Sequence, residues 1–73
     1  MPREAIITEA VLHILESEIE GLAEDALLEA VSVYLGVPVP LRLLKACLKR
    51  NRHRIIFQGG RFELSWDYRF GRR

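Results

Sequence analysis

Three cationic side chains are spaced so that they would share one face of a helix. Arg42, Lys45 and Lys49 occupy positions i, i + 3 and i + 7 of residues 41–51, and side chains three and four residues apart are neighbours on a helix surface. Lysine and arginine neutralise phosphates and release the counterions that surround nucleic acid. The spacing therefore predicts a cationic row suited to a phosphate backbone, although a solvated helix face without a ligand has the same pattern.

Other cationic side chains and one amide follow this row closely. The candidate nucleic-acid-binding residues are Arg42, Lys45, Lys49, Arg50, Arg52, Arg54, Gln58 and Arg61. Arginine can bind guanine with two hydrogen bonds, and an amide side chain can bind adenine in the same way. Asn51 is the only other amide, but it falls at the end of the expected helix, where capping suits it equally well. We therefore expect mainly backbone contacts, with any base contact made by Arg42 or Lys45.

The charge of the chain is divided unevenly along its length. The net charge is +1, yet residues 1–40 carry a net charge of −7 and residues 41–73 a net charge of +8. Such a division is typical of a protein with one face for a polyanion or an acidic partner. The alternative is that the two halves fold against each other and neutralise their charges.

Catalytic and metal-binding chemistry find little support in the sequence. A glycine-rich phosphate loop, a Ser/His/Asp set and a Cys/His nucleophile pair are all missing. Cys47 and His53 are too few to hold a metal ion, and Cys47 falls on the inner side of its helix, where a small core residue fits. We expect no enzyme, no catalytic residue, no cofactor and no metal.

The composition is that of one small globular domain. The 73 residues are 49% hydrophobic and 29% charged, which separates the chain from disordered proteins. No apolar run approaches the ~18 residues that span a bilayer, and the first residues lack the pattern of a secretory signal. We expect a soluble intracellular protein, cytoplasmic and nucleoid-associated or nuclear, that is neither secreted nor attached to a membrane.

Three helices and a hairpin are expected along the chain. Apolar side chains recur at helical spacing over residues 2–17, 24–35 and 41–51. Residues 53–66 fit a β-hairpin in which Gly59 and Gly60 supply the two positive φ angles of a tight turn. With that turn as the pivot, Phe57 lies opposite Phe62 and Ile55 opposite Leu64.

Alternation along this hairpin separates an apolar face from a polar one. The predicted inner face consists of Ile55, Phe57, Phe62 and Leu64, with His53 and Trp66 at its end. We expect residues 1–66 to form the domain and residues 67–73, which have no period, to form a loosely held basic tail.

The order of these elements resembles the winged helix-turn-helix superfamily. The similarity covers residues 4–66 and runs helix, short extension at Leu22, helix, turn, helix, hairpin. The residues that carry it are Leu27, Leu28 and Val31 on the second helix, Leu35-Gly36-Val37 at the turn, Leu41, Leu44 and Leu48 on the third helix, and residues 57–62 as the wing. The sequence departs from the pattern at Pro38-Val39-Pro40, where a serine or similar cap is usual. The fold expected from the resemblance is α+β and mostly helical, with three helices followed by a two-stranded wing.

The resemblance implies a function in double-stranded DNA binding. In many such proteins the third helix enters the major groove and the wing touches a neighbouring backbone. The protein would then be a small transcriptional regulator or a chromatin-type binder, acting as a homodimer, and these residues do not distinguish DNA from RNA.

The alternative is a module for protein–protein interaction or dimerisation that does not bind DNA. Several apolar residues have no obvious place inside the fold, and a patch of them would mark a partner surface. They are Val33, Val37, Val39, Leu43 and Ile56.

Overall fold

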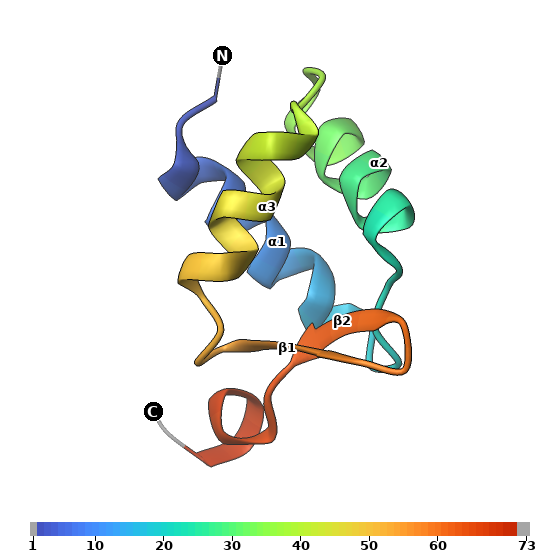
Figure 1. Cartoon of the computed structure of the whole chain (residues 1–73), viewed down its shortest axis with the longest axis vertical. Helices are drawn as coiled ribbons and strands as arrows, with labels where there is room; N and C mark the ends of the chain where they lie inside the picture. The colour runs from blue at the N-terminus through green and yellow to red at the C-terminus, as the bar shows by residue number, and fades with distance from the viewer. Residues whose placement is uncertain (1, 72–73) are drawn as a thin grey trace.

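The computed structural model describes residues 2–71, which form three helices followed by an antiparallel hairpin (Figure 1). The helices are α1 (Glu4–Ser17), α2 (Glu24–Leu35) and α3 (Leu41–Arg50). The strands are β1 (Ile55–Gln58) and β2 (Arg61–Leu64), and a π-helical turn, η1 (Asp67–Gly71), follows them. The predicted α+β, mostly helical layout is confirmed, and it is winged-helix-like in its order of three helices and a two-stranded hairpin.

The turn between α2 and α3 is held without the usual serine cap. Gly36 ends α2 with φ +77°, and its N–H donates to the carbonyls of Ser32 and Val33. Pro40 is the N-cap residue of α3, and its carbonyl accepts the N–H groups of Leu43 and Leu44. The Ser32 hydroxyl accepts the N–H of Val39 at 3.1 Å. A serine on α2 therefore anchors the stiff Pro-Val-Pro segment that sets the start of α3.

A single core joins all three helices to the hairpin. Helix α1 lies against α2, α3 and β2, and α3 crosses in front of α1 in Figure 1. The buried apolar side chains are Ile7, Ala10, Val11, Leu15, Leu27, Val31, Val39, Leu44, Cys47, Leu48, Ile55 and Leu64. Cys47 is a core residue, as predicted. Val39 is only 6% exposed, so the prediction that it lacks a place inside the fold is wrong.

The hairpin has the predicted register, and the Leu22 segment extends it. Ile55 pairs with Leu64 and Phe57 with Phe62. Leu22 lies beside Phe62 on the other edge of β2, with N–H to carbonyl distances of 2.9 and 2.8 Å in the two directions. These bonds attach the linker between α1 and α2 to the wing, and so fix the wing relative to the helices.

Two aromatic residues of the predicted inner face are exposed. Phe57 is 62% and Trp66 73% exposed, so the expectation that they point into the core is wrong, although Phe57 shares the apolar face of the hairpin with Ile55 as predicted. The core buries Ile55 and Leu64 and partly covers Phe62. Phe57 lies beyond the core towards the turn, with the centre of its ring 4.7 Å from that of Phe62. Beyond Ser65 the chain turns into η1, and Trp66 stacks on Phe70 at 4.8 Å.

Residues 67–71 are not loosely held. The Arg69 guanidinium donates to the carbonyls of Leu15 and Glu16 at 3.0 and 3.2 Å, and so caps the C-terminal end of α1. The Ser65 hydroxyl accepts the N–H of Tyr68. The expectation of a loose tail is therefore wrong for η1, and the last two residues of the chain, 72 and 73, lie outside the described part.

Burial of Cys47 predicts a loss of stability in alkali. The residue is 2% exposed, and this burial raises the pKa of its thiol above the usual 9.0. As the pH rises past 9, the unfolded chain loses the thiol proton while the folded chain retains it, so the free energy of unfolding falls. The slope from this group is at most about 1.4 kcal/mol per pH unit. In urea titrations between pH 8 and 10, the free energy of unfolding should fall less steeply with pH for Cys47→Ala than for the unaltered chain. Equal slopes would show that the Cys47 thiol does not cause the loss of stability in alkali.

Candidate nucleic-acid interface

Helix α3 directs a row of cationic side chains away from the core. Leu44, Cys47 and Leu48 are buried, and this inward set turns the side chains of Arg42, Lys45 and Lys49 to solvent, where all three are exposed. Within residues 2–71, none of these three cations lies in an ion pair. The row expected from the spacing therefore presents three free positive charges on one helix face.

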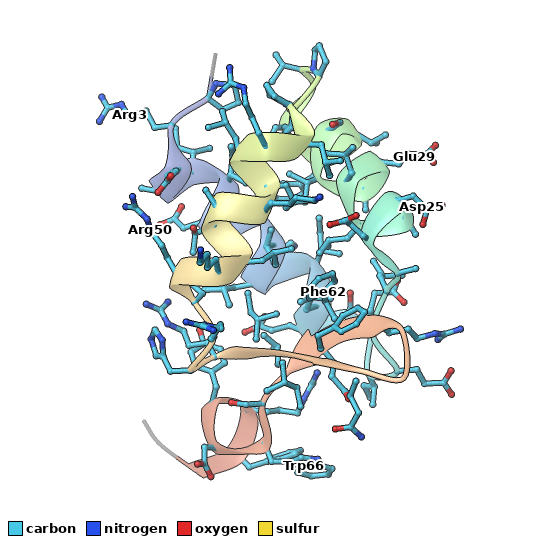
Figure 2. All side chains as sticks on the ribbon, viewed as in Figure 1. Arg3, Asp25, Glu29, Arg50, Phe62 and Trp66 are labelled. Atoms are coloured by element: carbon cyan, nitrogen blue, oxygen red, sulfur yellow. The ribbon has the colours of Figure 1, made fainter. Side chains whose placement is uncertain are left out.

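Two of the other candidate arginines are paired with acidic residues. Arg50 lies 3.2 Å from the Glu4 carboxylate of α1, and Arg61 lies 3.8 Å from that of Glu20. Exposed pairs of this kind contribute little to stability, but each acid offsets a positive charge that phosphate would need. Partial neutralisation between the two halves of the chain thus occurs at Arg50 and Arg61. The acids Asp25 and Glu29 project from α2 on the side away from Arg50 (Figure 2).

Arg54 lies on a face of the hairpin that does not adjoin the cationic row of α3. Its Nε lies 3.1 Å from Nε2 of His53, and its guanidinium carbon lies 5.9 Å from the centre of the Tyr68 ring in η1. Gln58 is exposed and pairs with Arg61 at the tip of the wing. Lys45, Lys49 and Arg52 line one common groove, whereas Arg54 lies towards η1.

Asn51 holds the end of α3, and its amide nitrogen is engaged within the protein. Its Nδ2 donates to the carbonyl of Cys47 at 2.7 Å and lies 3.5 Å from Oγ1 of Thr8, and the residue is 7% exposed. Its own carbonyl accepts the N–H groups of Arg54 and Ile55. The capping alternative for Asn51 is therefore confirmed. Its side-chain amide connects α3 to α1, and its main-chain carbonyl connects α3 to the start of the hairpin.

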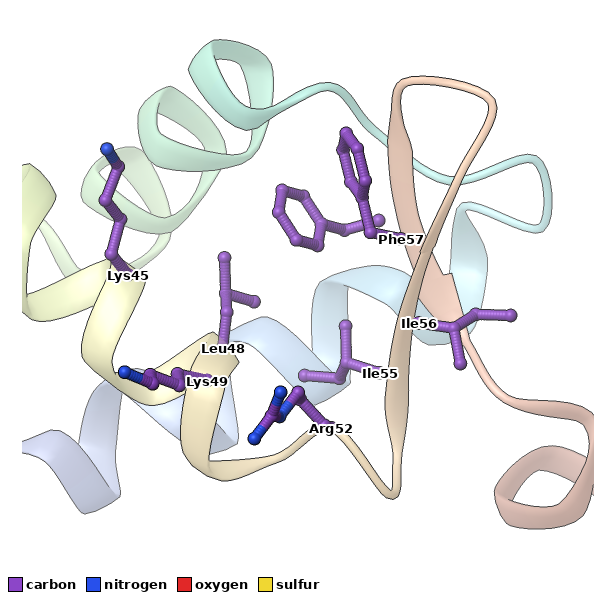
Figure 3. A pocket seen from close by; sticks show the side chains of 8 residues that line it. Lys45, Leu48, Lys49, Arg52, Ile55, Ile56 and Phe57 are labelled. Carbon is purple, nitrogen blue, oxygen red and sulfur yellow. The ribbon is translucent and has the colours of Figure 1, made fainter.

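An open groove of about 460 Å³ separates α3 from the apolar face of the hairpin. Its lining includes Leu48, Ile55, Phe57 and Phe62, and its cations are Lys45, Lys49 and Arg52. Figure 3 shows these cations around the apolar side chains, with Ile56 on the other side of its strand. The sequence did not indicate this groove, because the apolar face of the hairpin that contains Phe57 was expected to be the inner face.

Comparisons with protein-family models, with curated proteins and with solved structures find no match. In residues 2–71, no three histidine, cysteine, aspartate or glutamate side chains gather closely enough to hold a metal ion. No helix in this part of the chain is long and apolar enough to cross a membrane.

Proposed function

We propose that this domain binds double-stranded DNA, with α3 lying along the major groove and the wing beside a neighbouring backbone. The observation that supports this most strongly is the row of three exposed and unpaired cations, Arg42, Lys45 and Lys49, on the outward face of α3. Each cation that neutralises a phosphate releases condensed counterions, and this gain does not depend on the base sequence. Binding is therefore dominated by the backbone.

Contacts with the rest of the fold hold α3, and with it this row of cations, in one position. Helix α3 is fixed by its buried face against α1, by the Pro40 start and by the Asn51 cap. Arg52 extends the row at the C-terminal end of the helix, and Gln58 and Arg61 lie at the tip of the wing. A protein of this kind would act as a small transcriptional regulator or chromatin-type binder, in the cytoplasm or the nucleus. As a homodimer it would present two such rows.

Removing the row should weaken DNA binding and its dependence on salt. For the combined variant Arg42→Ala, Lys45→Ala and Lys49→Ala, we expect lower affinity for duplexes of any sequence. The slope of log affinity against log salt should fall by about 0.9 for each phosphate that is no longer neutralised, or about 2.7 for three phosphates. Fluorescence anisotropy with a labelled duplex at several salt concentrations measures both quantities.

The matched control is Arg3→Ala, which removes an exposed arginine outside α3. Its affinity and salt slope should stay close to those of the unaltered chain. Circular dichroism should show intact helices in every variant, because all four side chains are exposed. Unchanged affinity in the triple variant would refute the proposal.

A further inference from the structure

The groove between α3 and the hairpin exposes apolar surface that a phosphate backbone would leave uncovered. Leu48 and Ile55 are buried in its floor, while most of the Phe57 side chain is open to solvent beside Phe62. A DNA backbone offers phosphate and sugar, and its contacts are made with polar and cationic groups. Contiguous apolar surface with a polar rim is instead typical of a site for another molecule.

The rim of the groove has one sign of charge. Lys45, Lys49 and Arg52 are exposed, and none of them forms an ion pair within residues 2–71. The acids that lie near cations elsewhere, Glu4 and Glu20, pair with Arg50 and Arg61 and are not part of the lining. An occupant must therefore combine an apolar surface with flanking negative charge.

We propose that this groove docks an acidic amphipathic helix of a partner protein. Its apolar residues, spaced i, i + 3, i + 4 and i + 7, would lie on Leu48, Ile55 and Phe57, and its carboxylates would face the cationic rim. Helix α3 has ten residues and so forms a wall ~15 Å long, which matches two to three turns of a docked helix.

A second copy of this chain fits the groove less well than such a partner. The acidic helices of the chain are α1 and α2, and most of their large apolar side chains are buried in their own core, among them Val11, Leu15, Leu27 and Val31. The large apolar residues that these two helices leave exposed are Ile6 on α1 and the adjacent Val33 and Tyr34 on α2, and neither set has the spacing i, i + 3, i + 4 and i + 7. A docked helix needs an apolar stripe that is free. The occupant is therefore a segment of another protein.

Docking would have a regulatory consequence that rests on the proposed DNA binding. Lys45 and Lys49 belong both to the α3 row and to the rim of the groove. A helix seated there would cover two of the three cations in the row, so partner and DNA would exclude each other. The docking itself is tested in the absence of DNA, so its failure is distinct from failure of the DNA proposal.

The probe is a fluorescein-labelled synthetic peptide about four turns long, with leucine at i, i + 3, i + 4 and i + 7 and glutamate elsewhere. One control peptide has the same composition with its leucines spread around the helix, and a second has lysine in place of glutamate. We expect saturable binding of the probe by anisotropy, with both controls at least about tenfold weaker. No saturation up to about 1 mM, or equal binding of all three peptides, would overturn the proposal.

Matched variants locate the site on the protein. Phe57→Ser and Lys49→Glu should each weaken probe binding about tenfold, whereas Trp66→Ser and Arg3→Glu should leave it unchanged. Trp66 is an exposed aromatic residue and Arg3 an exposed cation, and neither lines the groove. If Trp66→Ser and Arg3→Glu weakened probe binding as much as Phe57→Ser and Lys49→Glu, the groove would not be the binding site.

Two further measurements test the position of the site and the identity of its occupant. In amide NMR spectra of the unaltered chain, the probe should shift signals of α3 and β1, and shifts confined to α2 would contradict the site. Sedimentation of the chain alone tests the other occupant. A dimer that Lys49→Glu abolishes would show that a second copy fills the groove, and the partner proposal would then be wrong.

Discussion

Replacing Gly21 with alanine should destabilise the fold considerably more than the same change at Gly36. Both residues have left-handed backbones, with φ +83° and +77°, and alanine in that region costs about 1–2 kcal/mol. At Gly21 an added Cβ would also lie 2.5 Å from the carbonyl oxygen of Phe62 and 3.2 Å from Cβ of Glu63, whereas at Gly36 it would meet nothing within 4 Å. The difference between the two variants therefore isolates the cost of the collision.

The added Cβ would disturb the hydrogen bonds that attach the wing to the linker between α1 and α2. The Phe62 carbonyl that the new Cβ would displace accepts the N–H of Leu22, and the Leu22 carbonyl accepts the N–H of Phe62. Urea unfolding measures the free energy, and hydrogen exchange at these two amides reports the bridge. We expect faster exchange at both amides in Gly21→Ala alone. Equal destabilisation by the two variants would show that backbone conformation, and not the close approach, is what requires glycine at position 21.

The helices and the hairpin register could be predicted because they depend on local pattern. The apolar spacing of α2 and α3 and the Gly59-Gly60 turn each act over a few residues, and the structure has α2 at the predicted residues and the predicted pairing of Phe57 with Phe62. Even the lone Leu22 after Gly21 had a place in the predicted element order. Its hydrogen bonds to Phe62 explain why a single residue suffices there.

The exposure of Phe57 and Trp66 could not be read from alternation. Alternation determines on which face of the hairpin a side chain lies, but its burial depends on whether another element covers that part of the face. The core reaches Ile55 and Leu64 and stops before Phe57. The order of η1 depends on a contact between Arg69 and the carbonyl end of α1, more than 50 residues away, and no local signal in the last residues indicates it.

The candidate site shows the same division between local and distant causes. The row of Arg42, Lys45 and Lys49 follows from spacing within one helix, so the sequence predicts its common face. The pairing of Arg50 with Glu4 and the contact of Arg54 with Tyr68 depend on how α1 and η1 pack. Sequence reasoning could therefore propose the cations, but it could not say which of them remain free.

Replacing Asn51 with aspartate should destabilise the fold strongly at neutral pH. The Nδ2 group that donates to the Cys47 carbonyl at 2.7 Å would become an oxygen that cannot donate when ionised. A buried carboxylate at the negative end of a helix is disfavoured by desolvation and by the helix dipole. We expect the free energy of unfolding to fall by about 3 kcal/mol or more at pH 7, the range for a buried charge without its partner.

Acid should partly restore the Asn51→Asp variant. Burial and the facing carbonyl favour the protonated carboxyl, so its pKa in the folded chain lies above the ordinary value near ~3.9. Below that folded pKa the carboxyl regains a proton that it can donate to the Cys47 carbonyl. The loss in free energy of unfolding, relative to the unaltered chain, therefore shrinks as the pH approaches about 4.

The control is Asn51→Ala, which loses the same hydrogen bond but has no titratable group, so its deficit of about 1–3 kcal/mol in the free energy of unfolding should not change with pH. Urea titrations at pH 4 and 7 give all four values. A pH-independent deficit in Asn51→Asp would mean that its carboxylate reaches water, and that the end of α3 is more open than the contacts with Cys47 and Thr8 imply.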